Sequence, residues 1–238
     1  MWHAAWCWEP HFLPYFAALG YDSYALSFRG HGSSEGRERL RWISFAEYVS
    51  DVEQVASQMA QPPVLVGHSI GGLVVQKYLE QHDSPAVVLL ASVPPETAVR
   101  IAARVARRRP LAAMKALLTL RMYPIIGTPE LAREALFSSD MPQKQVEDYA
   151  SRLQDESFRA FLDLLIPYRS HPEQIRTPLL VLGAAEDRFI LPKEVAATAS
   201  ALGVKAEMFP GMSHDMMLEA DWQMVANRIR AWLNGQGL

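Results

Sequence analysis

Short apolar runs alternate along this chain with longer segments that have a helical repeat. The run at residues 86–91 is apolar throughout, as expected for a strand in a parallel sheet that is covered on both faces. Strands that alternate with helices predict an α/β fold, with a mostly parallel sheet, right-handed crossovers and flanking helices. The predicted strands cover residues 23–28, 63–68, 86–91, 178–183 and 205–209.

The segments between these runs carry start and stop signals for helices. Ser44 and Glu47 form a capping box, and the helix that follows ends at the two prolines 62–63. In residues 11–19 the apolar positions are spaced by three and four, which indicates an amphipathic helix. Further helices are expected after Ser69, over 192–202 and over 221–233, the last two closed by glycine-containing stops.

The alternation of strand-like and helical segments stops between residues 94 and 172, where no strand-like run occurs. This interval predicts an all-helical insertion in an otherwise alternating chain. We therefore expect a core domain built from residues 1–93 and 173–238, and a helical cap at 94–172. The predicted cap helices cover residues 98–109, 111–122, 129–137, 142–153 and 157–166.

Composition narrows the class of protein. A length of 238 residues suits one domain with or without an insertion, and a net charge of −3 argues against a partner that is a nucleic acid. Cys7, the single cysteine, excludes an internal disulfide and fits a reducing compartment. No apolar run approaches the roughly 18 residues of an integral membrane segment, and the first residues lack a signal-peptide pattern. We expect a cytoplasmic monomer or homodimer.

The candidate chemistry begins with Gly67-His68-Ser69-Ile70-Gly71, which lies between a predicted strand and a predicted helix. A sharp turn in this context exposes a serine hydroxyl and strains the backbone at the serine. We therefore expect that the neighbouring positions, Gly67 and Gly71, have room only for a small residue. The alternative interpretation is a glycine-rich turn with a capping serine.

Two further predicted strands end in loops with complementary chemistry. Functional groups in such sheets lie beyond the carboxyl ends of the strands. Of the seven histidines, His214 follows the last strand and is the best candidate base, whereas the others lie in loop or helix-surface contexts or, like His68, point away from the serine. Asp187 is the favoured carboxylate because the apolar residues 189–192 can bury its turn; Glu186 and Asp215 compete, with Asp215 expected on the surface or at a cap.

These segments give the chain a clear resemblance. Gly-His-Ser-Ile-Gly-Gly, Phe-Arg-Gly-His-Gly-Ser-Ser, Gly-Ala-Ala-Glu-Asp-Arg-Phe-Ile and Gly-Met-Ser-His-Asp resemble motifs of α/β-hydrolase fold proteins of the esterase, lipase and lysophospholipase-like type. The resemblance implies a catalytic triad of Ser69, Asp187 and His214, a cap over the site and no metal or organic cofactor. It also implies a small-molecule ester as substrate, cleaved through an acyl-enzyme.

One departure from the family concerns the oxyanion hole. The family carries a strand and a His-Gly motif upstream of the segment that begins at Trp2, and this sequence starts at Met1. We expect an N-terminally shortened fold that lacks a central strand and earlier edge strands. By resemblance, one oxyanion donor is the Ile70 N–H and the other comes from Met1 or Trp2; a chain that begins at Met1 offers an ammonium group there instead of an amide.

Specificity is expected to come from the cap and from residues around the serine. The candidate substrate-binding residues are apolar or aromatic, and the alternative for each is packing within the fold: Trp6, His68, Met114, Leu118, Met122, Phe161 and Leu165. The run of arginines at 104 and 107–109 suggests either contact with an acidic head group or a solvated basic face.

Two other classes of function remain open from the sequence. A serine nucleophile argues against the aspartate-dependent dehalogenases and epoxide hydrolases of this fold, but the same triad serves thioesterases, acyltransferases, C–C hydrolases and lyases. The departure at the N-terminus also leaves room for a non-catalytic binding protein.

Overall fold

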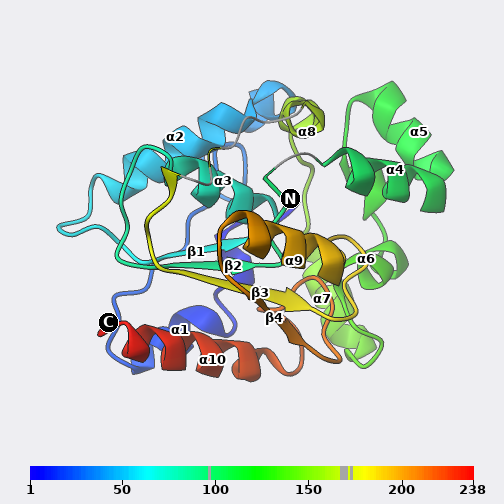
Figure 1. Ribbon diagram of the computed structural model, residues 1–238. Coiled ribbons are helices and arrows are strands. Elements are labelled where there is room, and N and C mark those ends of the chain that lie inside the picture. The colour runs from blue at the N-terminus through cyan, green and yellow to red at the C-terminus, as the bar shows by residue number, and fades with distance from the viewer. Residues whose placement is uncertain (96–97, 167–170, 172–173) are drawn as a thin grey trace.

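The computed structural model describes residues 1–95, 98–166, 171 and 174–238. Its sheet has the strand order β1-β2-β3-β4, and every neighbouring pair is parallel (Figure 1). Each connection between strands therefore crosses over through helices, as the alternating pattern predicted. The strands are β1 (Leu65–His68), β2 (Val87–Leu90), β3 (Leu179–Ala184) and β4 (Ala206–Phe209).

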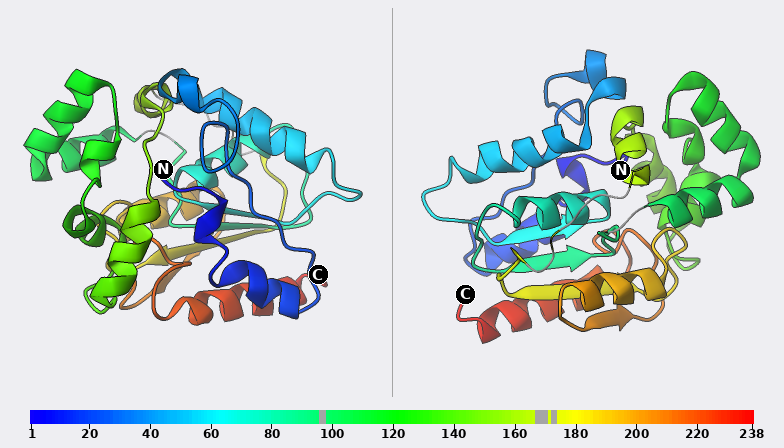
Figure 2. Two further views of the ribbon diagram at one scale, coloured as in Figure 1. Left: turned by 180° about the vertical axis from the view of Figure 1, so that it is seen from behind. Right: turned by 45° about the horizontal axis from the view of Figure 1, so that its top comes forward.

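Successive side chains of the central strands point to opposite faces of the sheet and belong to two separate hydrophobic cores. In β2, Val87 and Leu89 belong to one apolar cluster and Val88 and Leu90 to the other, and all four are fully buried. Helices α2 (Phe45–Ala56), α3 (Ile70–Tyr78) and α9 (Pro192–Ala201) cover one face, and α1 (Phe12–Ala18) and α10 (Trp222–Gly235) cover the other (Figures 1 and 2). Coverage of both faces explains why the run in β2 has no polar positions.

The start signal of α2 and the glycine stop of α9 are confirmed, whereas two predicted helix ends are wrong: α2 ends at Ala56, six residues before the prolines 62–63, and α10 continues through Gly235. The Ser44 hydroxyl accepts a hydrogen bond from the Glu47 N–H, while the Glu47 carboxylate accepts one from the Ser44 N–H, which completes the capping box of α2. Gly203 follows α9 with a φ of +72°, the left-handed conformation in which a side chain is disfavoured. Short 3₁₀ turns lie at η1 (Ala5–Cys7), η2 (Arg37–Trp42) and η3 (Tyr123–Ile125).

A helical insertion connects β2 to β3, and its described residues contain no strand. It comprises α4 (Val99–Arg108), α5 (Pro110–Thr119), α6 (Pro129–Leu136), α7 (Gln143–Arg152) and α8 (Phe158–Leu165). The predicted helices are confirmed, with ends that differ by one to three residues. In Figure 1 α4 and α5 form the outer arm, while α8 lies beside α2. The division into a core domain and a cap domain stays a prediction.

The predicted strand at 23–28 is wrong. This segment is described in full, yet it takes part in no ladder of the sheet. Leu26 and Phe28 pack against the core, but a strand requires a neighbouring backbone with which to exchange hydrogen bonds. Among the described residues, the backbone groups of Tyr24, Ala25 and Leu26 make no such bond, so local propensity alone was insufficient.

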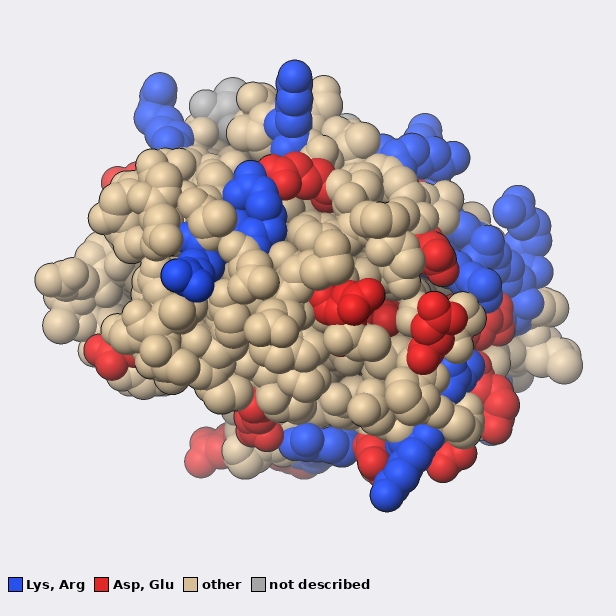
Figure 3. All heavy atoms as spheres, turned by 90° about the horizontal axis from the view of Figure 1, so that it is seen from below, with Lys and Arg blue, Asp and Glu red and all other residues tan. Residues whose placement is uncertain are grey.

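The face formed by α1 and α10 carries acidic and basic side chains in a mixed arrangement (Figure 3). One of the ion pairs on it joins Arg228 in α10 to Glu207 in β4, with a distance of 2.7 Å between Arg228 Nε and Glu207 Oε2. No helix in the part of the chain that the structure describes has the length and apolar character required to cross a bilayer.

Candidate active site

Ser69 lies at the sharp turn between β1 and α3. Its φ of +53° and ψ of −121° are unfavourable for a residue with a side chain, as the motif predicted. The turn is possible because β1 and α3 approach closely: a methyl group on Gly67 would lie 2.7 Å from Gly72 Cα, and one on Gly72 would lie 2.4 Å from Ser92 Oγ. Gly71, which the sequence suggested must be small, has open space around it, so the second constrained position is Gly72.

The structure brings Ser69, His214 and Asp187 into one hydrogen-bonded series. Ser69 Oγ lies 2.9 Å from His214 Nε2, and His214 Nδ1 lies 2.7 Å from Asp187 Oδ2. All three residues are buried, with 3–7% of their surfaces exposed. The carboxylate can accept a hydrogen bond from Nδ1–H, which favours the tautomer whose unprotonated Nε2 faces the Ser69 hydroxyl.

Asp187 is selected over its sequence neighbours by its loop. Its Oδ1 accepts hydrogen bonds from the backbone N–H groups of Phe189 (2.7 Å) and Ile190 (2.9 Å), which orient the carboxylate toward His214. Glu186 is exposed to solvent. Asp215 is also buried, but it contacts other partners described below.

The electrostatics of the series favour a base that holds its proton more tightly than free histidine. Burial alone would lower the pKa of His214, but the Asp187 carboxylate outweighs it and raises that pKa above its ordinary value. The imidazolium form of His214 is thereby stabilised.

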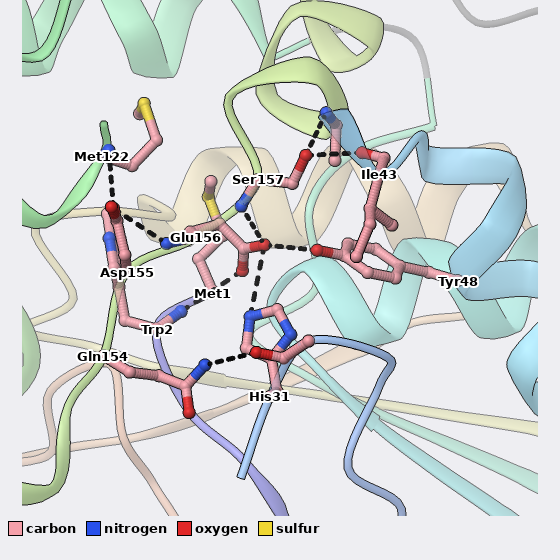
Figure 4. A network of polar contacts seen from close by, with 12 residues as sticks. Met1, Trp2, His31, Ile43, Tyr48, Met122, Gln154, Asp155, Glu156 and Ser157 are labelled. Carbon is pink, nitrogen blue, oxygen red and sulfur yellow. Dashed lines mark hydrogen bonds and ion pairs between the residues drawn. The ribbon is translucent and has the colours of Figure 1, made fainter. Parts of the chain in front are cut away.

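The residues predicted as oxyanion donors differ in what their backbone N–H groups contact. Ile70 is the first residue of α3, so its N–H has no acceptor in the preceding turn of the helix. The Trp2 N–H instead donates to Glu156 Oε2 at 3.3 Å (Figure 4), so it is directed at that carboxylate. Of the two residues considered, Met1 is left as the better candidate, and the oxyanion assignment stays a prediction.

A buried cluster next to the series was missed from the sequence. Asp215 is fully buried, which corrects the expectation of a surface or cap residue, and its Oδ2 lies 2.9 Å from His3 Nε2. His68 Nε2 donates to the backbone carbonyl of His214 at 2.9 Å. His3 and His31 lie in loops, as predicted, but His3 is half-buried and His31 is buried. No local pattern marks these positions, because their partners are distant in sequence.

The candidate substrate-binding residues fall into three groups. Trp6 and Met122 are buried, and Phe161 and Leu165 are half-buried within the insertion. Met114 and Leu118 lie on the outer side of α5 with 53% and 79% of their surfaces exposed, so the structure does not enclose them in a pocket. A pocket role for these residues and for His68 stays a prediction.

The arginines of α4 and the residue after it are partly engaged by the fold. Arg104 forms an ion pair with Glu194 at 2.7 Å and donates to the carbonyl of Phe189, in the loop that follows Asp187. Arg109 donates to the carbonyls of Ile125 and Leu131. This run is therefore not a uniformly solvated basic face, because Arg104 binds α4 to the loop that follows Asp187, which we call the acid loop.

The ligand atoms of His68, His214 and Asp215 lie within 4.8 Å of one another, a spacing compatible with a metal. Both ring nitrogens of His214 are already hydrogen-bonded, to Ser69 and to Asp187, and His68 Nε2 is hydrogen-bonded to a backbone carbonyl. A metal at this place would have to break the series, so these residues do not fit a resident ion.

Comparisons with known proteins identify the family and the fold of this chain. A model of the alpha/beta hydrolase family matches residues 1–228. A monoacylglycerol lipase of Mycolicibacterium smegmatis is 24% identical over 237 residues, covering 94% of this chain and 81% of that protein. The crystal structure of the Paleococcus ferrophilus monoacylglycerol lipase has a TM-score of 0.74 at 22% identity, covering 99% of this chain and 91% of its own.

An esterase from Exiguobacterium antarcticum is similar at a TM-score of 0.67 and 16% identity, covering 88% of this chain and 80% of its own. At such low sequence identities the structural likeness establishes only the fold. The family is established by the family model, which matches nearly the whole sequence. The chain belongs to the alpha/beta hydrolase family.

Proposed function

We propose that this protein hydrolyses carboxylic esters, with Ser69 as nucleophile, His214 as general base and Asp187 as the carboxylate that orients the base. The observation that carries the proposal is the series of two short contacts, 2.9 Å from Ser69 Oγ to His214 Nε2 and 2.7 Å from His214 Nδ1 to Asp187 Oδ2. A serine hydroxyl becomes a useful nucleophile only when a base can accept its proton, and this geometry supplies that base.

In the first half of the reaction Ser69 Oγ attacks the ester carbonyl while its proton passes to His214 Nε2. The negative charge on the carbonyl oxygen faces the Ile70 N–H at the start of α3, where the helix dipole also favours an anion. The tetrahedral intermediate then collapses, the bond to the alcohol breaks, and His214 gives its proton to the leaving oxygen. Ser69 is left as an acyl ester.

In the second half a water molecule replaces the alcohol. His214 Nε2 takes a proton from the water as it attacks the acyl carbonyl, and the resulting tetrahedral intermediate releases Ser69 with that proton. The products are a carboxylic acid and an alcohol, and the enzyme returns to its starting state.

The proposed substrate is a small or lipid-like apolar ester. Monoacylglycerol lipases are among the relatives, and the insertion contributes many apolar residues to one of the two cores. We propose that residues 94–172 act as the cap that sets specificity, which is supported by the succession of helices inserted between β2 and β3.

A comparison of Ser69→Ala with wild type tests this function on p-nitrophenyl esters and on monoacylglycerols. We expect the variant to lose at least about 10³-fold in kcat, because no other group can form the acyl ester. A fluorophosphonate probe is expected to label wild type and not the variant. Ser33→Ala, which changes an exposed serine of the 29–36 loop, serves as the control. Undiminished turnover by Ser69→Ala would refute the proposal, and an inert Ser69 in folded protein would favour a binding role.

A further inference from the structure

A second histidine–carboxylate pair lies against the Ser69–His214–Asp187 series. His3 Nε2 is 2.9 Å from Asp215 Oδ2, and His3 Nδ1 is 2.7 Å from the carbonyl oxygen of Met1. The His3 side chain is 10% exposed and the Asp215 side chain is fully buried. The pair joins the first residues of the chain to the loop that carries His214, which are 212 positions apart in sequence.

Both ring nitrogens of His3 face acceptors. The Met1 carbonyl can only accept a hydrogen bond, and an ionised Asp215 carboxylate can only accept one as well. Nδ1 therefore donates to the carbonyl, and a hydrogen bond from Nε2 to the carboxylate requires a proton on that nitrogen too. Although burial acts to raise the pKa of Asp215, His3 outweighs it and lowers that pKa, so Asp215 is ionised.

His68 extends this pair to the base itself. Its Nε2 donates to the His214 carbonyl at 2.9 Å and lies 3.9 Å from Asp215 Oδ1, and the rings of His68 and His214 are 4.7 Å apart. Burial, followed by the neighbouring His214, lowers the pKa of His68 well below its ordinary value. A neutral His68 thus donates from Nε2, and Asp215 Oδ1 has no hydrogen-bond partner of its own.

Resting on the proposed function, we infer that His3 and Asp215 are a charge-balanced pair of positioning residues that set the proton affinity of His214 and hold the Met1–Trp2 segment against it. Asp215 is adjacent to His214 in the chain and buried beside it, so its charge acts on the base directly. His3 supplies the opposite charge within hydrogen-bond distance. The base therefore interacts with one uncompensated carboxylate, Asp187.

Other titratable groups also face this cluster. Asp187, Asp215 and the Met1 amino group act on His214. The groups that act on Asp215, or are acted on by it, are His3, His68, His214, the Met1 amino group, Cys7 and Glu219. Because these neighbours respond to Asp215 as well, His3→Gln, which keeps that carboxylate, is the more direct test of the pair.

The test is the pH profile of kcat/KM for His3→Gln, Asp215→Asn and the double variant, measured from pH 5 to 9 on a p-nitrophenyl ester. The acid limb reports the free base. His3→Gln leaves the Asp215 carboxylate unbalanced and is expected to move that limb up by about one pH unit. Asp215→Asn removes the carboxylate with which a proton on His3 Nε2 is paired, so its limb is expected within about 0.3 units of wild type. The double variant is expected within about 0.3 units of wild type, because both charges are gone.

A merely structural role would lower rates at every pH and would not shift the limb of His3→Gln upward. A His3→Gln variant that keeps the wild-type midpoint, or an Asp215→Asn or double variant that shifts upward as much as His3→Gln, would overturn the inference. His82→Gln is the matched control, since His82 pairs with Glu53 at 3.1 Å on the exposed surface. If Asp215→Asn fails to fold, as seen by circular dichroism, His3→Gln alone decides the matter through its upward shift.

Failure of the inference is distinguishable from failure of the proposed function. Wild type that is neither labelled by a fluorophosphonate nor able to hydrolyse esters would contradict the function. Active wild type with unshifted variants would contradict only the role of His3 and Asp215.

Discussion

Glu156 gives the most quantitative prediction, because its buried carboxylate ties the helical insertion to the core. It accepts hydrogen bonds from the Tyr48 hydroxyl (2.6 Å), the Ser157 N–H (2.7 Å) and the Trp2 N–H (3.3 Å). His31 Nε2 forms an ion pair with it at 3.4 Å, and both side chains are 2% exposed (Figure 4). The perturbation is Glu156→Gln, which keeps the shape and removes the charge.

The magnitude follows from the proton affinity of this carboxylate. Burial alone would raise the pKa of Glu156, but His31 and the hydrogen bonds to the carboxylate hold it at about 2, against an ordinary value of 4.5. At about 1.4 kcal/mol per pH unit, the ionised form contributes about 3 kcal/mol to the free energy of unfolding at neutral pH. In the variant the new amide NH₂ also faces a group that donates, so one contact is lost.

The sign of the pH dependence is fixed by the lowered pKa. The contribution is fully present above pH 4.5 and is lost as the pH falls from 4.5 to about 2, where the folded protein also binds the proton. Urea unfolding of wild type and Glu156→Gln should therefore differ by about 3 kcal/mol at pH 7 and by about 1 kcal/mol at pH 3. A difference that is constant between these pH values would refute the reasoning.

Glu9→Gln is the matched control for this measurement. Glu9 pairs with Arg152 at 3.1 Å, but the two side chains are 56% and 44% exposed. An exposed pair contributes at most about 1 kcal/mol, so the control should unfold nearly as wild type at both pH values. A control as unstable as Glu156→Gln would mean that burial is not the cause of the effect.

Two further predictions concern the turn and the acid loop. Asp187→Asn is expected to lower kcat by about 10⁴-fold while the protein stays folded, since the wrong tautomer of His214 is stabilised; an activity loss under tenfold would contradict this role. Gly72→Ala is expected to unfold the protein or destabilise it by more than about 2 kcal/mol, because the added methyl group would overlap Ser92. Gly71 has open space around it, so Gly71→Ala should change the free energy of unfolding by less than about 1 kcal/mol. Thermal unfolding of both variants tests this, and equal stability of the two would contradict it.

The elements that sequence reasoning located are those whose signal lies within a few residues. The capping box at Ser44, the glycine stop at Gly203 and the strained turn at Ser69 are local combinations of residue type and spacing. Their physical causes, a satisfied N–H group or a backbone angle that favours glycine, act between near neighbours. The same holds for Asp187, whose carboxylate is oriented by N–H groups two and three residues ahead.

The failures have the opposite character, because each depends on a partner far away in the chain. Residues 23–28 have the local pattern of a strand, but a ladder needs a neighbouring backbone that the segment does not meet. Asp215 looks like a surface carboxylate until His3 is placed against it across 212 positions of sequence. The loop position of His31 was predicted correctly, but its burial was not, because its partner Glu156 is distant in sequence.

This contrast indicates how the site is held together. The groups proposed to perform chemistry are positioned by local devices at the ends of β1 and β3, whereas their mutual distances depend on buried polar contacts between remote segments. His68, one residue before the nucleophile, fixes the backbone of His214, and Asp215, one residue after the base, binds His3. Because a buried ionic contact that loses one partner costs about 3–5 kcal/mol, the N-terminal segment is constrained to stay beside the base. Sequence motifs therefore identify the reacting groups, and the long-range pairs determine whether those groups meet.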